Sequence, residues 1–106
     1  MNEKPNLLYL KEISGGDVEF EKKLLEIVKK ELPEEINTYK NCLIENNFIE
    51  AAELVHKIKH KISIFGLEKG YQVALDYENN LKLNNLKIKL EFEEILNSMI
   101  SFLKMV

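Results

Sequence analysis

The fold is constrained most by residues 50–66, which read EAAELVHKIKHKISIFG and place apolar side chains at the spacing of an α-helix. With about 100° of rotation per residue, six of them fall within a sector of roughly 100°. These six are Ala51, Leu54, Val55, Ile58, Ile62 and Phe65. The stripe predicts a helix packed against a core. On the same helical wheel His56 lies about 140° from Ala51, so we expect it to be exposed.

The remaining chain is predicted to form further helices, joined by short polar or glycine-containing links. These helices are expected over residues 7–13, 17–32, 33–45, 68–82 and 86–104. Asp17 is a suitable N-terminal cap, and Pro33 should kink or break the helical segment because its ring is hard to accommodate inside a helix. A buried stripe is expected early in the second segment, from Phe20, Leu24, Ile27 and Val28.

No stretch shows the alternating pattern of a strand, and the links are short enough to favour antiparallel neighbours. We therefore predict an all-α fold, an antiparallel up-and-down four-helix bundle with additional short N-terminal helices. A length of 106 residues corresponds to a single domain, spanning residues 1–106.

Composition narrows the classes of function. The net charge of −3 argues against a nucleic-acid partner, because such proteins normally carry a basic face. Cys42 is the single cysteine, and the N-terminus resembles no secretory signal, so a cytoplasmic protein is expected. No apolar run approaches the 18 or so residues of a membrane span, so we expect no membrane association.

Three residues of the predicted histidine helix follow a known spacing. His56, Lys59 and Gly66 resemble the motif of the histidine-containing phosphotransfer (HPt) domain family, approximately H-x-x-K-G-x-x-x-x-x-G. The chain departs from that motif at its first glycine, where it has His60. The length and the order of the helices are also similar to those of the family.

The resemblance implies that His56 accepts a phosphoryl group in a two-component phosphorelay. The partners would be the receiver domains of a hybrid sensor histidine kinase and of a response regulator. The chain would need no cofactor of its own, because the Mg²⁺ used in transfer would sit in the partner receiver domain. It has no nucleotide-binding motif, so it is expected to be a monomeric phosphocarrier without kinase activity.

The chemistry of phosphoryl transfer suggests a role for Lys59. Neutral imidazole is nucleophilic near pH 7, and a fixed cation stabilises the charge on the transferred group. Lys59 lies one helical turn from His56 and is the candidate cation, although it could simply be a solvated lysine. Lys57 and Lys61 are placed at the far edge of the helix and are expected to be solvated.

Other residues are assigned supporting roles. The small residues Ala52, Ser63 and Gly66 lie on the His56 side of the wheel and would let a partner approach, while Gly66 could equally mark the helix end. The resemblance further implies that Glu78 and Lys82, in the next helix, lie near the histidine. A carboxylate there could accept the Nδ1 hydrogen and leave Nε2 free to react. They could also form an ordinary exposed pair.

Two other functions stay open at this point. One is a helical interaction module of the same fold whose histidine is not used. The other is a metal site containing His56 and His60, which are four residues apart; however, Lys57 replaces the glutamate of the H-E-x-x-H motif. His60 should be at least half exposed, on the same side of the helix as His56.

Overall fold

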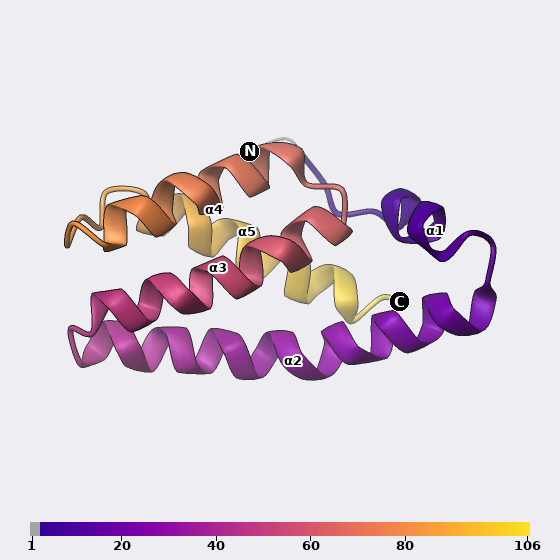
Figure 1. Cartoon of the computed structure of the whole chain (residues 1–106), viewed down its shortest axis with the longest axis horizontal. Helices are drawn as coiled ribbons and strands as arrows, with labels where there is room; N and C mark the ends of the chain where they lie inside the picture. Colours follow the sequence, from indigo (N-terminus) through magenta and orange to yellow (C-terminus); the bar gives the residue numbers. More distant parts are fainter. Residues whose placement is uncertain (1–2) are drawn as a thin grey trace.

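The computed structural model describes residues 3–106, which form helices and no strand in that range. The helices are α1 (Leu8–Ser14), α2 (Val18–Ile44), α3 (Phe48–Ile64), α4 (Glu68–Leu81) and α5 (Lys89–Leu103). The predicted all-α class is confirmed. Successive long helices, α2 to α5, run in alternating directions along a body that measures 42 × 25 × 20 Å (Figure 1).

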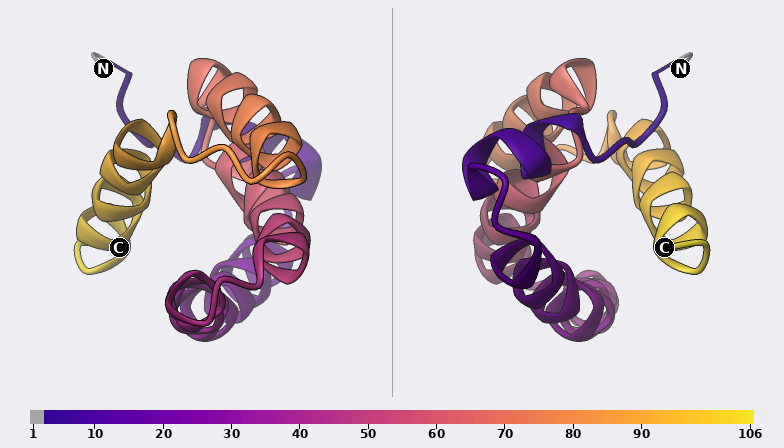
Figure 2. Two further views of the ribbon diagram at one scale, coloured as in Figure 1. Left: turned by 90° about the vertical axis from the view of Figure 1, so that its left-hand side faces the viewer. Right: turned by 90° about the vertical axis from the view of Figure 1, so that its right-hand side faces the viewer.

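The histidine helix α3 lies between two neighbours. It packs most extensively against α4 and α2, whereas α5 packs against α4 and touches α2 only lightly. Viewed end-on, α2, α3 and α4 form a curved row, and α5 stands on its concave side (Figure 2). Residues on α3 are therefore flanked by α2 on one side and α4 on the other.

The predicted apolar stripe of α3 faces the core. Its six members are each 8% exposed or less, and they join one cluster with buried residues of α2, α4 and α5. The largest fully buried side chains of these three helices are Tyr39, Tyr77 and Phe92. The predicted buried face of α3 is confirmed, and the position of this face determines which side of the helix is turned outward.

The start of α2 at Asp17 and the end of α3 at Gly66 follow the predicted capping chemistry. Asp17 accepts a hydrogen bond from the backbone N–H of Phe20 at 3.1 Å and begins α2. Asn47 caps α3 in the same way, through the N–H of Glu50. Gly66 has a φ of +74°, the left-handed conformation that glycine adopts readily, and a Cβ there would lie 2.9 Å from the side chain of Asn6.

Pro33 does not break the helix, so of the predicted kink or break the break is wrong. α2 is a single helix of 27 residues that contains Pro33 in its interior. A proline inside a helix costs about 3 kcal/mol relative to alanine. Burial of apolar side chains both before and after it, among them Leu32 and Ile36, offsets this cost at roughly 1.5–3 kcal/mol each. Pro33 itself is exposed, and it has no amide hydrogen to donate to the carbonyl of Lys29.

The predicted buried stripe at the start of α2 is also wrong in part. Val28 is 2% exposed, but Phe20 and Ile27 are 48% and 46% exposed. Phe20 and Ile27 lie roughly 100° or more around the helix from the centre of the buried face of α2, and the N-terminal end of α2 also extends beyond α3 toward α1 (Figure 1). Periodicity identifies an apolar face, but it does not reveal where a covering helix ends.

Candidate functional site

His56 lies on the outward face of α3, as the wheel predicts. Its side chain is 53% exposed, so one edge of the ring can be reached from solvent while the other contacts protein. The protein-facing atom is Nδ1, which lies 3.1 and 3.3 Å from the two carboxylate oxygens of Glu78. Within residues 3–106 no hydrogen bond is made by Nε2.

Glu78 comes from α4 and is 7% exposed. Burial by itself would raise the pKa of this carboxyl, but hydrogen bonds from Lys59 and His56 outweigh burial and hold the pKa below its usual value. The Glu78 side chain is therefore a carboxylate at neutral pH. The expected proximity of Glu78 to His56 is observed, and the alternative of an ordinary exposed Glu78–Lys82 pair does not describe it.

The charge of Glu78 determines which nitrogen of His56 carries the hydrogen. An ionised carboxylate only accepts hydrogen bonds, so at 3.1 Å it selects the tautomer in which Nδ1–H is the donor. Lys59 Nζ is 3.3 Å from the same Nδ1, but an ammonium only donates, so we assign this proximity as a contact and not a hydrogen bond. The lone pair of neutral His56 is then on Nε2.

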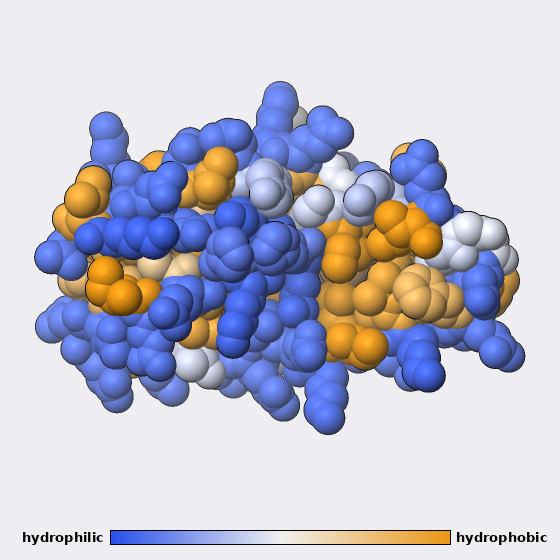
Figure 3. Space-filling view, viewed as in Figure 1, coloured by the Kyte–Doolittle hydropathy of each residue, from blue (hydrophilic) through white to orange (hydrophobic). Residues whose placement is uncertain are grey.

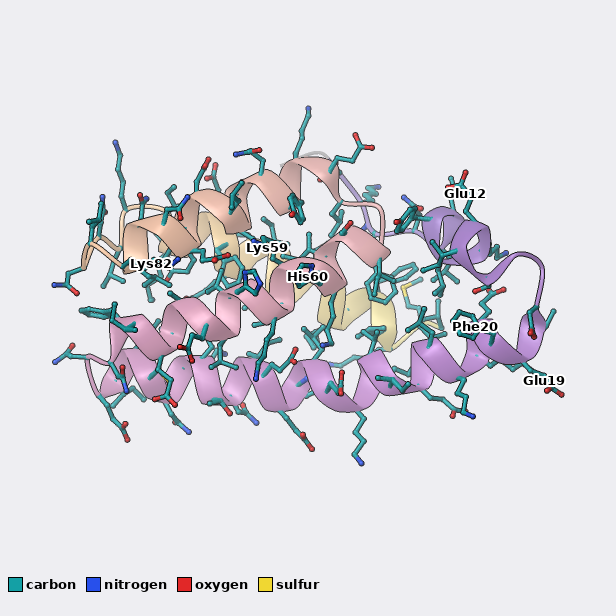
Figure 4. All side chains as sticks on the ribbon, in the orientation of Figure 1. Glu12, Glu19, Phe20, Lys59, His60 and Lys82 are labelled. Carbon is teal, nitrogen blue, oxygen red and sulfur yellow. The ribbon has the colours of Figure 1, made fainter. Side chains whose placement is uncertain are left out.

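Lys59 is buried, which the wheel alone does not reveal. It is 5% exposed, donates a hydrogen bond to Glu78 Oε1 at 2.9 Å, and has its Nζ 5.6 Å from the centre of the Tyr71 ring. The side chain lies between α3 and α4 (Figure 4). Lys59 is beside the imidazole as predicted, yet its ammonium is on the Nδ1 side of the ring, and the alternative of a solvated lysine is wrong.

A groove runs past the exposed edge of His56. Its volume is about 660 Å³, and Lys82, 54% exposed in its side chain, lies at its border with Nζ 3.9 Å from Glu78 Oε2. The groove is lined by Ile49, Ala52, Glu53, His56, Lys57, Glu78 and Lys82. Another cavity, of about 320 Å³ between α2 and α5, contains neither histidine.

The structure brings some of the predicted supporting residues to this groove and places others elsewhere. Ala52 is 1% exposed and lines the groove beside His56. His60 is exposed on the same side of α3, with its ring 5.0 Å from that of His56 and nearly perpendicular to it. Ser63 shares a separate hollow with His60, and Gly66 packs against Asn6 at the helix end. Ser63 and Gly66 therefore do not border the exposed edge of His56.

Lys61 is not the solvated lysine that was expected. Its Nζ is 3.2 Å from Glu31 and 3.0 Å from Glu35, and the side chain is only 12% exposed. It links α3 to α2, on the opposite side from the link that Lys59 makes to α4. Lys57 is exposed as predicted but also lines the His56 groove.

Sequence reasoning overlooked Ile49, Glu53 and Tyr71. Ile49 and Glu53 precede His56 by seven and three residues, the spacing of one helix face, and this signal was available in the sequence. Tyr71 comes from α4 and covers the ammonium of Lys59. No spacing rule links Tyr71 to α3, because the contact depends on how the two helices pack.

Chemically, the arrangement presents one nucleophilic ring nitrogen at the surface and holds the other in a buried, charged network. No group of three histidine, cysteine, aspartate or glutamate side chains within residues 3–106 is arranged to hold a metal ion. None of the helices of the same range combines the length and hydropathy that crossing a membrane requires.

Comparison of the chain with protein-family models, with curated proteins and with solved structures gives no match, so the assignment of this site rests on its geometry.

Proposed function

We propose that this chain is a histidine phosphotransfer protein, a four-helix up-and-down bundle that carries a phosphoryl group on His56. In this proposal it works in the cytoplasm between the receiver domains of a hybrid sensor kinase and of a response regulator. Those partners supply Mg²⁺, and the chain has no kinase activity of its own. The observation that carries the proposal is the half-exposed imidazole whose Nδ1 is bonded to a buried carboxylate.

The proposed step follows from the tautomer. The Nε2 lone pair attacks the phosphorus of an aspartyl phosphate on the receiver, the bond from phosphorus to the carboxylate oxygen breaks, and the carboxylate leaves with that electron pair. The ring becomes cationic as the N–P bond forms, and the Nδ1–H donated to Glu78 places that charge next to a carboxylate. The reverse step regenerates neutral His56 and the acyl phosphate.

The acceptor is tested by incubating the protein with radiolabelled, phosphorylated receiver domains. We expect label on the wild type and on His60→Gln, and none on His56→Gln. His56→Gln also changes the hydrogen bond to the buried Glu78 carboxylate, and hydrogen bonds to charged groups contribute about 1.5–3 kcal/mol, so the melting curve of this variant is compared with that of wild type to show that lost labelling does not reflect unfolding. The modification should be acid-labile and alkali-stable, as a phosphoramidate is.

His60→Gln is the matched control, because it changes the same residue type one turn away on the same face. If His60→Gln alone abolished labelling, the acceptor would move to His60. If a broad panel of receivers labelled none of the three proteins, the chain would be an interaction module instead.

The role of Lys59 is tested with a second pair of variants. Lys59→Ala should slow transfer by roughly tenfold or more, equivalent to about 1.4 kcal/mol on the barrier. Lys61→Ala, which also removes a largely buried, ion-paired lysine, should leave the transfer rate nearly unchanged. If Lys59 acts by holding Glu78 in place, Glu78→Gln should slow transfer by a similar factor. Equal losses in Lys59→Ala and Lys61→Ala would contradict a specific role.

A further inference from the structure

The N-terminal part of α2 carries an apolar stripe that the chain itself does not cover. Phe20, Leu24 and Ile27 fall within about 60° of one another on the helix. Phe20 and Ile27 are nearly half exposed, and Leu24 is half-buried. On the helical wheel the stripe lies beside the buried face that begins at Val28, with its centre turned by roughly 90° from the centre of that face.

Neighbouring side chains enlarge this surface. Tyr9 and Ile13 of α1, which packs against α2, are each 44% exposed. Apolar side chains gather over this end of the molecule, whereas polar ones dominate most of the rest of the same face (Figure 3). Contiguous exposed apolar surface of this kind is a usual sign of a protein interface.

The charges beside the stripe indicate what covers it. On one side of the stripe, Glu19, Lys23, Glu26 and Lys30 lie within about 60° of one another and form a flank along it. All four are exposed, and none makes an ion pair within residues 3–106. Along the helix their signs alternate as acid, base, acid, base. Reversed, this order becomes base, acid, base, acid, so the flank is complementary to its own antiparallel copy.

The geometry of an antiparallel helix pair brings these complementary charges together. When two identical helices pair antiparallel about a two-fold axis, each flank meets the same flank of the other helix, whereas in a parallel pair it meets the opposite flank. Pairing centred between residues 24 and 25 places Glu19 opposite Lys30 of the second copy, and Lys23 opposite Glu26. All four cross-pairs are then attractive, and the two apolar stripes face one another.

We propose that a second copy of this chain covers the stripe, giving a two-fold symmetric dimer through antiparallel pairing of the N-terminal part of α2. This proposed dimer differs from the monomer expected from the sequence. The inference rests on α2 alone and does not depend on phosphotransfer by His56.

The experiment uses two double variants that exchange charges without changing composition or net charge. Lys23→Glu combined with Glu26→Lys keeps every antiparallel cross-pair attractive. Glu19→Lys combined with Lys23→Glu makes every cross-pair repulsive. In sedimentation equilibrium at low salt, we expect wild type and the first variant to have twice the mass of one chain. The second should dissociate with a dissociation constant raised at least about tenfold, because four attractions become repulsions.

A second test addresses the apolar stripe. Phe20→Ala should also weaken the dimer, whereas Leu83→Ala, at an exposed leucine near the other end of the molecule, should not. Circular dichroism melting of every variant checks that the helices persist. A wild type with the mass of a single chain at all concentrations would overturn the proposal, and so would two charge variants that behave alike.

Discussion

At the level of single residues, the site depends on the mutual burial of Lys59 and Glu78. Their side chains are 6% and 10% exposed, and each is the nearest opposite charge of the other. Removing one member of a buried pair leaves an uncompensated charge, which commonly costs 3–5 kcal/mol. We therefore expect Lys59→Met and Glu78→Gln each to lower the free energy of unfolding by roughly 3 kcal/mol.

The double variant Lys59→Met/Glu78→Gln should lose much less than the sum of the two, because neither charge then remains buried alone. Urea denaturation of wild type, the two single variants and the double variant measures the four free energies of unfolding that this thermodynamic cycle needs. Strictly additive losses would mean that the two side chains do not interact as their 2.9 Å separation indicates.

The same carboxylate makes stability depend on pH. Because the pKa of Glu78 is lower in the fold than in the unfolded chain, its contribution is complete above the unfolded value of about 4.3. The contribution disappears as the pH falls through the lowered pKa. The stability difference between wild type and Glu78→Gln should therefore be largest at neutral pH and shrink below about pH 4. Denaturant titrations at a series of pH values measure this, and a constant difference would contradict it.

At the level of helices, the sequence predicts the buried face of α3 and its capping residues better than it predicts which helices pack together. The apolar stripe of α3, the cap at Asp17 and the turn at Gly66 depend on local spacing and backbone chemistry, and these predictions hold. The burial of Lys59 and the pairing of Lys61 with α2 depend on which helix packs on each side of α3. No pattern within one helix contains that information.

Pro33 illustrates the same point in energetic terms. The local rule predicts a break, but it weighs only the lost hydrogen bond and the steric clash, and not the buried residues that precede and follow Pro33. α5 likewise begins at Lys89 and not at the predicted residue 86, so the link after α4 is longer than expected. The sequence thus predicts elements more reliably than their exact extent.

The missing amide hydrogen of Pro33 leads to a prediction about the stability of α2. Pro33→Ala should restore the hydrogen bond to Lys29 and raise the free energy of unfolding by about 2 kcal/mol, after allowing for the greater freedom of the unfolded chain. Glu34→Ala, at the adjacent exposed position, should change it by less than about 0.5 kcal/mol. An unchanged value for Pro33→Ala would indicate that α2 accommodates the proline without loss.

At the level of the whole molecule, a buried polar chain joins three helices. The hydroxyls of Tyr39 on α2 and Tyr77 on α4 are 2.7 Å apart, and Tyr39 also donates to Glu93 of α5 at 3.0 Å. Glu93 is in turn 3.4 Å from Lys89. Tyr39 is the middle member, so its hydroxyl accepts from Tyr77 while it donates to Glu93. This series of hydrogen bonds supplies a specific link between α5 and α2, which otherwise touch only lightly.

Because Tyr39 is the middle member of this series of hydrogen bonds, two conservative variants should lose different amounts of stability. Tyr39→Phe removes two hydrogen bonds and leaves the Tyr77 hydroxyl buried without a partner, so it should cost about 2–3 kcal/mol. Tyr77→Phe removes only one bond and should cost about 1 kcal/mol. Thermal or urea unfolding of both variants measures the difference, and equal losses would contradict the middle position assigned to Tyr39.

The tyrosine pair also has a spectroscopic consequence. The chain contains four tyrosines and no tryptophan, so its near-ultraviolet spectrum is dominated by phenol groups. Burial raises the pKa of both Tyr39 and Tyr77 above its ordinary value, and for Tyr39 the hydrogen bond with Tyr77 adds to this. Phenolate absorbance from these two rings should therefore emerge in alkali only as the fold opens. A simple absorbance titration would then report the opening of the core without any attached dye.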